Sequence, residues 1–260
     1  MLKYNNIFGL LGIFSYICNI LNYNISIMNK RFSLNDFSNK EITEETYIQF
    51  HKLIADDDEE GAIKLLKECG DSFNVNYEYK SRVPLFSAIN NRMYDLYDEI
   101  VNHPTFDCGI EAGFGETLLE SLLYLRGTDG IPMTENDTAN LDRMIKTVLN
   151  NKKFDFNVTN LNNDTAINVA CEYPKLLWVV EELANKKEVN PNIVNDFECT
   201  ALTNAIRHKN IEAVKILSKR NDITVRTIDL EEADKVGIDL ADFGFETAIK
   251  LKKAHEYVMA

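Results

Sequence analysis

The feature that most constrains the fold of this chain is an internal repeat. The segments Tyr97–Ile110, Ile145–Val158 and Val180–Ile193 align without gaps, with an apolar pair at the fourth and fifth positions followed by asparagine. They begin 48 and then 35 residues apart, which we interpret as one repeat period with an insertion in the first interval. A fixed period of this size is typical of solenoids, whose short repeats bury their apolar faces against one another.

A second element recurs upstream of these segments. A threonine precedes each of four apolar-periodic runs, at Thr117, Thr165, Thr200 and Thr247, and the run after Val83 (VPLFSA) has the same form. Threonine is favoured as the N-cap of a helix. Helices this short cannot stand alone in water, so the pattern predicts an all-α fold of stacked helix pairs.

These residues resemble the ankyrin repeat, a unit of about 33 residues that opens with T-P-L-H-x-A before a short helix. The best single match is Thr200–Val225 (TALTNAIRHKNIEAVKILSKRNDITV). Glu59–Asn76 is similar to the second helix of a repeat and its following loop, with Gly70 at the helix end. The resemblance covers about residues 43–259 and implies an ankyrin-type helix-pair solenoid, with about five repeats and a C-terminal capping helix.

The resemblance implies that residues 32–260 form one ankyrin-repeat domain. The expected repeats cover residues 43–76, 81–110, 115–158, 164–193 and 199–225, and a terminal helix over 246–258 closes the stack. The third repeat contains an insertion at 126–140, whose Gly, Pro, Thr and Asn content predicts a mobile surface loop. A long connection at 225–245 holds a candidate short helix at 229–236.

The sequence departs from the family pattern at the histidine of T-P-L-H-x-A. At that position stand Phe86, Glu120, Asn168, Thr203 and Lys250. In the family this histidine ties neighbouring turns through hydrogen bonds. We therefore expect those bonds to be lost and the array to be less stable than one with the consensus sequence.

The first 31 residues form a separate apolar segment with three basic residues and no acid, in a chain whose net charge is -13. The apolar character of residues 7–28 is long enough for a membrane anchor, although asparagines interrupt it. A lysine before such a run also suits a signal peptide, although no small-residue cleavage site follows. A start at Met28 would make the segment an artefact of gene prediction. All three readings stay open, and we expect a cytoplasmic protein with membrane association possible through residues 7–28.

No residue pattern typical of a catalytic, metal or cofactor site is found. The five cysteines include no C-x-x-C pair, and the four histidines lack ligand spacing. Asp56–Gly61 begins like a calcium loop, but Lys67 stands where a bidentate glutamate is needed. The glycines of Gly109–Gly115 lack the lysine of a phosphate-binding loop. We expect no enzyme, metal or cofactor; an enzyme with an unrecognised site is the distant alternative.

The resemblance implies a non-catalytic scaffold that binds a partner protein on a concave face. That face is lined by the first helix of each repeat and by the fingers, the loops that join one repeat to the next. The first-helix candidates are Ser87, Asn90, Asn91, Tyr124, Glu172, Tyr173, Asn204, Arg207 and His208. The finger candidates are Tyr77, Tyr79, Arg82, Phe114 and Phe197. An alternative for Tyr124 and Tyr173 is packing against neighbouring helices, and Trp178 is expected in the core.

The net negative charge of the chain indicates the kind of partner to expect. It favours a protein with a basic patch and opposes nucleic-acid binding, which depends on neutralising phosphates. We expect the chain to be monomeric. The alternative function is a membrane-tethered ankyrin adaptor or effector anchored by residues 7–28.

Overall fold

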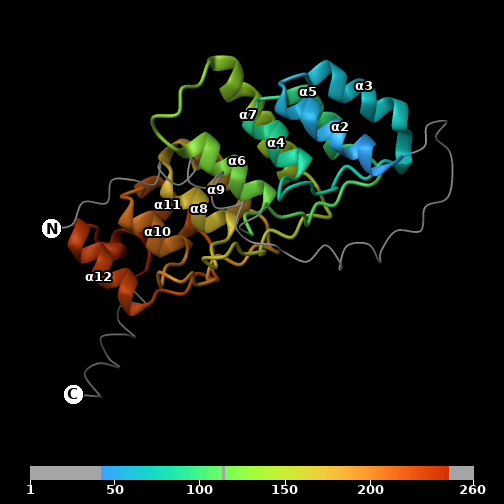
Figure 1. Cartoon of the computed structure of the whole chain (residues 1–260). Helices are drawn as coiled ribbons and strands as arrows, with labels where there is room; N and C mark the ends of the chain where they lie inside the picture. The colour runs from blue at the N-terminus through green and yellow to red at the C-terminus, as the bar shows by residue number, and fades with distance from the viewer. Residues whose placement is uncertain (1–41, 113–114, 246–260) are drawn as a thin grey trace. The chain divides into compact units, whose positions relative to one another are not determined.

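The computed structural model of the chain describes residues 42–112 and 115–245 (Figure 1). Within these residues the regular structure is helical, with two isolated β-bridges and no longer strand. The chain divides into two compact units, Met1–Asp107 (unit 1) and Cys108–Ala260 (unit 2). The predicted class, an all-α helix-pair solenoid, is confirmed.

Residues 42–107, the described part of unit 1, form two helix pairs. The helices are α2 (Glu44–Ala55), α3 (Glu59–Cys69), α4 (Pro84–Asn90) and α5 (Tyr94–Val101), with a 3-10 turn, η2 (Gly70–Ser72), after α3. The two pairs pack side by side, with α2 against α4 and α3 against α5. The interior is aromatic: Phe50 and Phe73 are fully buried and meet edge to face, with ring centroids 5.1 Å apart.

The described residues of unit 2 form three helix pairs and a further helix. The helices are α6 (Leu118–Gly127), α7 (Glu135–Leu149), α8 (Ala166–Glu172), α9 (Leu177–Ala184), α10 (Ala201–Arg207), α11 (Ile211–Leu217) and α12 (Thr227–Val236), with 3-10 turns η3 (Pro174–Leu176) and η4 (Leu240–Phe243). The first helices α6, α8, α10 and α12 pack against one another in that order, and α9 packs against α11 (Figure 1). Small residues such as Ala201, Ala205 and Ala213 are fully buried where these helices approach closely.

The first helices begin where the sequence predicts. The hydroxyl groups of Thr117, Thr165 and Thr200 each accept a hydrogen bond from the backbone amide three residues later. Such a bond satisfies one of the amides that a helix start leaves without a partner. Thr247 and the terminal helix expected at 246–258 lie outside the described residues, as do residues 1–31.

The backbone adopts a left-handed conformation two residues before the caps of α4, α6, α8 and α10. The residues are Ser81 (φ 58°), Gly115 (φ 66°), Asn163 (φ 59°) and Glu198 (φ 60°). Only one of the four is glycine, although positive φ values carry a steric penalty for other residues. The turn is therefore a shared structural feature of the fingers that the residue types do not reveal.

Asparagine side chains join the loops of successive repeats. Asn192 Nδ2 donates to the carbonyl oxygen of Asp222 (2.7 Å), and its Oδ1 accepts from the amide of Thr224 (2.8 Å). The same two bonds join Asn157 to Glu188 and Asn190 in unit 2, and Asn76 to Thr105 and Asp107 in unit 1. We call this arrangement the asparagine clasp. It uses both polar atoms of the amide and joins three pairs of successive loops.

The expected loss of hydrogen bonds at the family-histidine position is wrong at two positions. Asn168 Nδ2 donates to the carbonyl oxygen of Ile193 in the following loop (3.2 Å). Thr203 Oγ1 donates to Asp229 Oδ1 on α12 (2.6 Å). These shorter side chains still connect neighbouring elements, because the turns lie close enough for an amide or a hydroxyl to reach.

The insertion in the third repeat leaves a shorter loop than the 15 residues expected at 126–140. Helix α6 continues through Gly127, and α7 begins at Glu135, so the loop covers residues 128–134. Thr134 and Asp137 form a reciprocal capping box, with Asp137 N donating to Thr134 Oγ1 (3.1 Å) and Thr134 N to Asp137 Oδ2 (2.8 Å). This box starts α7 inside the expected loop. In the long connection, the candidate helix at 229–236 is confirmed as α12, which begins two residues earlier.

Candidate partner-binding face

Three candidate residues of unit 2 occupy equivalent positions on adjacent helices. Tyr124, Glu172 and Arg207 each lie seven residues after the threonine cap of their own first helix. All three are half-buried, and their helices α6, α8 and α10 pack side by side. The structure therefore brings these predicted residues into one row, with part of each side chain open to solvent.

Tyr173 lies beside this row and packs on α6. Its ring meets that of Tyr124 edge to face, with the centroids 6.5 Å apart. A β-carbon added to Gly127 would lie 2.5 Å from Tyr173 Cγ, so only glycine leaves room for the ring there. Packing, the alternative for these two tyrosines, is thus confirmed, and both rings remain half-exposed.

Glu172 is held by an amide beneath it. Asn204 Nδ2 donates both to Glu172 Oε1 (3.1 Å) and to the carbonyl oxygen of Asn168 (3.1 Å). Asn204 itself is only 3% exposed, so it orients Glu172 and does not offer a surface to a partner. Burial, and to a smaller extent the nearby carboxyl group of Asp164, raise the pKa of Glu172 to about 7.

Further carboxyl groups lie inside unit 2. Glu120 is fully buried; its Oε2 accepts from the amide of Thr117 (3.1 Å), and its Oε1 has no hydrogen-bond partner. Burial raises the pKa of Glu120 to about 8 and also raises that of Asp164, which accepts from Asn195 Nδ2 (2.6 Å). Desolvation favours the protonated form of a carboxyl group. The protonated form of Glu120 is therefore favoured near neutral pH, a property that the sequence pattern did not predict.

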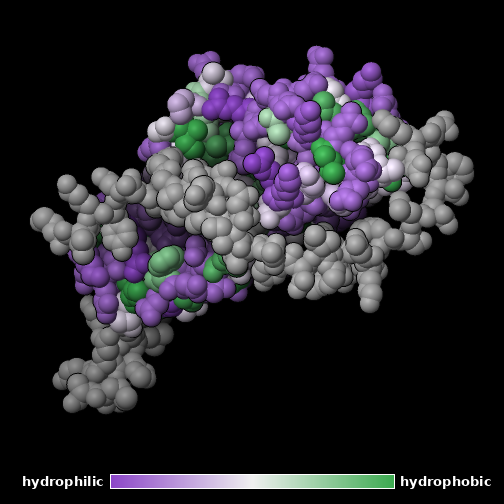
Figure 2. All heavy atoms as spheres, in the orientation of Figure 1, coloured by the Kyte–Doolittle hydropathy of each residue, from purple (hydrophilic) through white to green (hydrophobic). Residues whose placement is uncertain are grey.

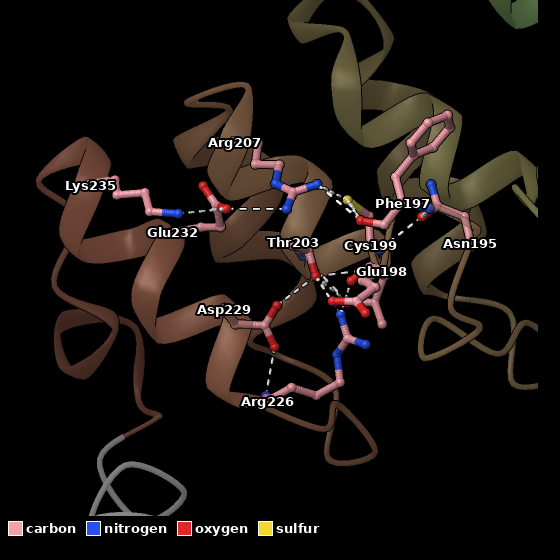
Figure 3. Close-up of polar contacts among 11 residues, drawn as sticks. Asn195, Phe197, Glu198, Cys199, Thr203, Arg207, Arg226, Asp229, Glu232 and Lys235 are labelled. Atoms are coloured by element: carbon pink, nitrogen blue, oxygen red, sulfur yellow. Dashed lines mark hydrogen bonds and ion pairs between the residues drawn. The ribbon is translucent and has the colours of Figure 1, made fainter.

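Arg207 links the row to the last helix (Figure 3). Its Nη2 forms an ion pair with Glu232 Oε1 on α12 (3.1 Å), and its Nη1 donates to the carbonyl oxygen of Phe197 (3.3 Å) and contacts Cys199 Sγ. The guanidinium group is therefore fixed between a finger and α12. His208, the next residue, ends α10 and is exposed.

The candidates in unit 1 include residues with structural roles. The ring of Tyr77 stacks on that of Tyr47 (centroids 4.2 Å apart), and Asn91 Nδ2 donates to the carbonyl oxygen of Ile54 (2.7 Å). Tyr79 and Arg82 exchange two backbone hydrogen bonds across the finger. Arg82, Asn90 and Asn91 are exposed, whereas Tyr77, Tyr79 and Ser87 are half-buried.

Phe114, a finger candidate, lies outside the described residues. Trp178 is half-buried rather than in the core as expected, and the ammonium group of Lys146 lies over its ring at 5.4 Å. The indole therefore packs under a flexible cation at the edge of the interior.

Neither metal binding nor membrane crossing is supported by the part of the chain that the structure describes. Over residues 42–112 and 115–245, no group of three His, Cys, Asp or Glu side chains is placed to hold a metal ion. No helix in the same residues is long and apolar enough to span a bilayer. Asp58, part of the calcium-like segment, instead caps α3 by accepting from Gly61 N (2.9 Å).

Comparison with protein families agrees with this architecture. Residues 136–227, which run from α7 to the start of α12, match the family model described as ankyrin repeats (3 copies). No curated protein matches the chain. Ankyrin repeats generally mediate protein–protein interactions, and domains built from them are typically non-catalytic. The chain thus contains ankyrin repeats, recognised in residues 136–227.

Proposed function

We propose that this chain is a non-catalytic scaffold that binds a partner protein through the first-helix face of unit 2. This face consists of Tyr124, Glu172, Tyr173 and Arg207. The observation that carries the proposal is the row of half-exposed side chains at equivalent positions on three adjacent helices. Repeated positions on stacked helices build the extended surfaces that solenoids use for binding.

The chemistry of the row suits protein recognition. Tyrosine and arginine supply large contact areas and directional hydrogen bonds, and both are enriched among the residues that dominate binding energy. Contacts to Asn204, Gly127 and Glu232 hold three of the four side chains in place. Side chains that are already ordered lose less entropy on binding. The net charge of -13 favours a partner with a basic patch.

Site-specific photo-crosslinking tests the proposal. A photo-reactive amino acid is placed at Tyr124 on α6 or at the exposed His208, the C-cap of α10, and at the exposed Glu181 on α9 as the control. We expect both first-helix positions to capture the same protein from a cell lysate, and we expect the control position not to capture that protein. Equal capture from Glu181 would contradict the assignment of the face.

Substitutions measure the contribution of the face to binding of the captured protein. Tyr173→Ala and Arg207→Ala are each expected to weaken binding by roughly tenfold or more, as at residues that dominate an interface. Because both residues also pack within unit 2, thermal unfolding of each variant must show that the fold is retained. Tyr124→Ser and Glu172→Gln serve as second variants if either chain fails to fold.

A further inference from the structure

The most exposed large apolar side chains of the described residues gather on two fingers of unit 2. They are Val158 (38% exposed), Leu161 (68%), Val194 (42%) and Phe197 (61%). The surface visible in Figure 2 is otherwise mostly hydrophilic, with apolar residues exposed in small separate groups. Leaving a leucine and a phenylalanine in water has a cost that burial against another molecule would remove.

The two fingers are fixed to each other. The amide of Asp196 donates to the carbonyl oxygen of Asn162 (2.9 Å), and Asn163 Nδ2 donates to Asp196 Oδ1 (2.7 Å). Leu161 and Phe197 therefore lie on neighbouring loops that hydrogen bonds hold in register. We call residues 158–163 and 193–198 the finger-tip pair.

Each finger is also ordered from within. Asn160 Oδ1 accepts from the amides of Asn162 (2.9 Å) and Asp164 (3.0 Å). In the next finger, Asn195 Oδ1 accepts from the amides of Phe197 (3.0 Å) and Cys199 (2.8 Å). Loops ordered in this way present their side chains without a further entropic cost on binding.

The charge around the two apolar side chains is negative. The finger-tip pair contains Asp196 and Glu198, both exposed, and no lysine or arginine. A β-carbon on Gly115 would lie 3.0 Å from Leu161 Cγ, so the preceding finger reaches Leu161, and that finger adds the exposed Glu111.

Two cations lie behind the second finger. Arg207 and Arg226 donate to the backbone carbonyls of Phe197 and Glu198, and Arg207 is also paired with Glu232. In Figure 3 the ring of Phe197 points away from this polar network. The apolar ring and the cations therefore face different directions.

We propose that the finger-tip pair docks a partner protein segment that presents an apolar side chain flanked by lysine or arginine. The inference rests on the proposed function and names the chemistry of the partner. Leu161 and Phe197 bury the apolar side chain, and the surrounding carboxylates attract its basic neighbours. This combination places an apolar anchor at the centre and complementary charge at the rim.

A displayed library of random 12-residue peptides tests the proposal on the full chain. Peptides selected on the wild type are measured by fluorescence anisotropy against the wild type and the double variant Leu161→Asn/Phe197→Ser. The matched control is Ile131→Asn, which removes a half-buried apolar side chain from another loop of unit 2. We expect enriched peptides with an apolar residue next to Lys or Arg, and roughly tenfold or greater weakening in the double variant alone.

A second pair of substitutions tests the charge. Glu111→Gln/Glu198→Gln removes two negative charges at exposed positions, and we expect weaker binding with a reduced dependence on salt. Unchanged salt dependence, or enrichment of acidic peptides, would overturn the assigned chemistry.

The outcomes separate this inference from the proposed function. Peptides that lose affinity in the Tyr173→Ala chain but not in Leu161→Asn/Phe197→Ser would overturn the finger-tip site while supporting the first-helix face. If no peptide is enriched, or if none depends on either set of residues, both proposals fail. Because Leu161 and Phe197 are mostly exposed, the double variant is expected to melt at the wild-type temperature.

Discussion

Units 1 and 2 build the same helix pairs from different interiors. Unit 1 is filled by aromatic rings, among them Phe50, Phe73 and Tyr97, whereas unit 2 packs alanines closely and buries the carboxyl group of Glu120. Both units nevertheless contain the left-handed finger turn and the asparagine clasp. The matched family model covers residues 136–227, entirely within unit 2. Unit 1 therefore keeps the backbone turn and the clasp, although the family model does not match its sequence.

The buried carboxyl groups of unit 2 and His51 of unit 1 predict opposite dependences of stability on pH. In unit 2 burial raises the pKa of Glu120 and Glu172, so the folded state holds protons that the unfolded chain releases. Their contribution to stability is present at acidic pH and is lost as pH rises from about 4.5 towards about 8. In unit 1 burial lowers the pKa of His51, so stability there is lost as pH falls below about 6.5.

The largest expected effect concerns Glu120. A pKa near 8 implies roughly 3–5 kcal/mol between its two protonation states, and Glu120→Gln removes that dependence. We expect the wild type to lose stability between pH 5 and pH 8.5 and the variant to lose much less. The measurement is urea unfolding followed by the fluorescence of Trp178, the single tryptophan of the chain, which reports on unit 2.

Glu135→Gln provides the control, because Glu135 is exposed in the same unit. Its pH dependence should match that of the wild type. An identical slope in Glu120→Gln would show that the buried carboxyl does not set the response of unit 2.

The asparagine clasp should matter in both units, and more in unit 1. Asn76 is buried and makes its two clasp bonds out of water, whereas Asn192 is half-exposed. Losing two hydrogen bonds of this kind costs about 1–3 kcal/mol, with the higher value where the partners stay buried. Asn76→Ala and Asn192→Ala are compared by native-state hydrogen exchange of α5 and α11. Asn102→Ala and Asn185→Ala, at exposed helix ends, are the matched controls.

Helix capping offers a sharper contrast between the units. In unit 1 Glu59 of α3 caps the neighbouring helix α5, accepting from Asp95 N (2.9 Å) and Leu96 N (3.0 Å). In unit 2 Asn210 caps its own helix α11. Loss of a cap costs about 0.5–2 kcal/mol. Glu59→Ala should therefore speed amide exchange in α5 as well as α3, while Asn210→Ala should act on α11 and on the end of α8, where the Cys171 carbonyl oxygen accepts from Asn210 Nδ2 (3.1 Å).

Glu60→Ala is the control for this experiment, since Glu60 is the exposed neighbour of Glu59. If Glu59→Ala leaves exchange in α5 unchanged, the capping bond between the two helix pairs contributes nothing to stability.

The smallest expected effect is on His51, whose Nε2 lies 2.8 Å from the carbonyl oxygen of Tyr77. Its ring should titrate below the usual histidine range when followed by NMR, because burial disfavours the charged form. His51→Gln keeps a donor for Tyr77 and should reduce the acid sensitivity of unit 1. A pKa at or above 6.5 for His51 would remove the proposed contrast between the units.

Local signals made much of the fold predictable. The threonine caps and apolar spacing placed the first helices, since both act within one turn of helix. The capping box at Thr134 and Asp137 was present in the sequence and would have shortened the predicted loop. The clasp also left a signal: Asn157 and Asn192 occupy the same position in the aligned segments, although the many other asparagines obscured it.

Side-chain burial was less predictable. Asn204 was expected on the binding face and lies beneath it, and Glu120 was read only as a replaced histidine. In both cases burial depends on the packing of neighbouring repeats, which no local pattern specifies. The candidate row of Tyr124, Glu172 and Arg207 followed from the repeat register, whereas Leu161 at the finger tip did not, because loop exposure carries no periodic signal.

The clasp has a consequence for how such a chain can change in length. One side of the clasp is a single asparagine, but the other side is main chain, whose carbonyl and amide groups are the same whatever residue carries them. A repeat that ends in this asparagine can thus be followed by any repeat with the same loop conformation. Duplication or deletion of a whole repeat would therefore preserve the hydrogen bonds of the clasp. The array can gain or lose a repeat without a compensating substitution at the new contact between loops.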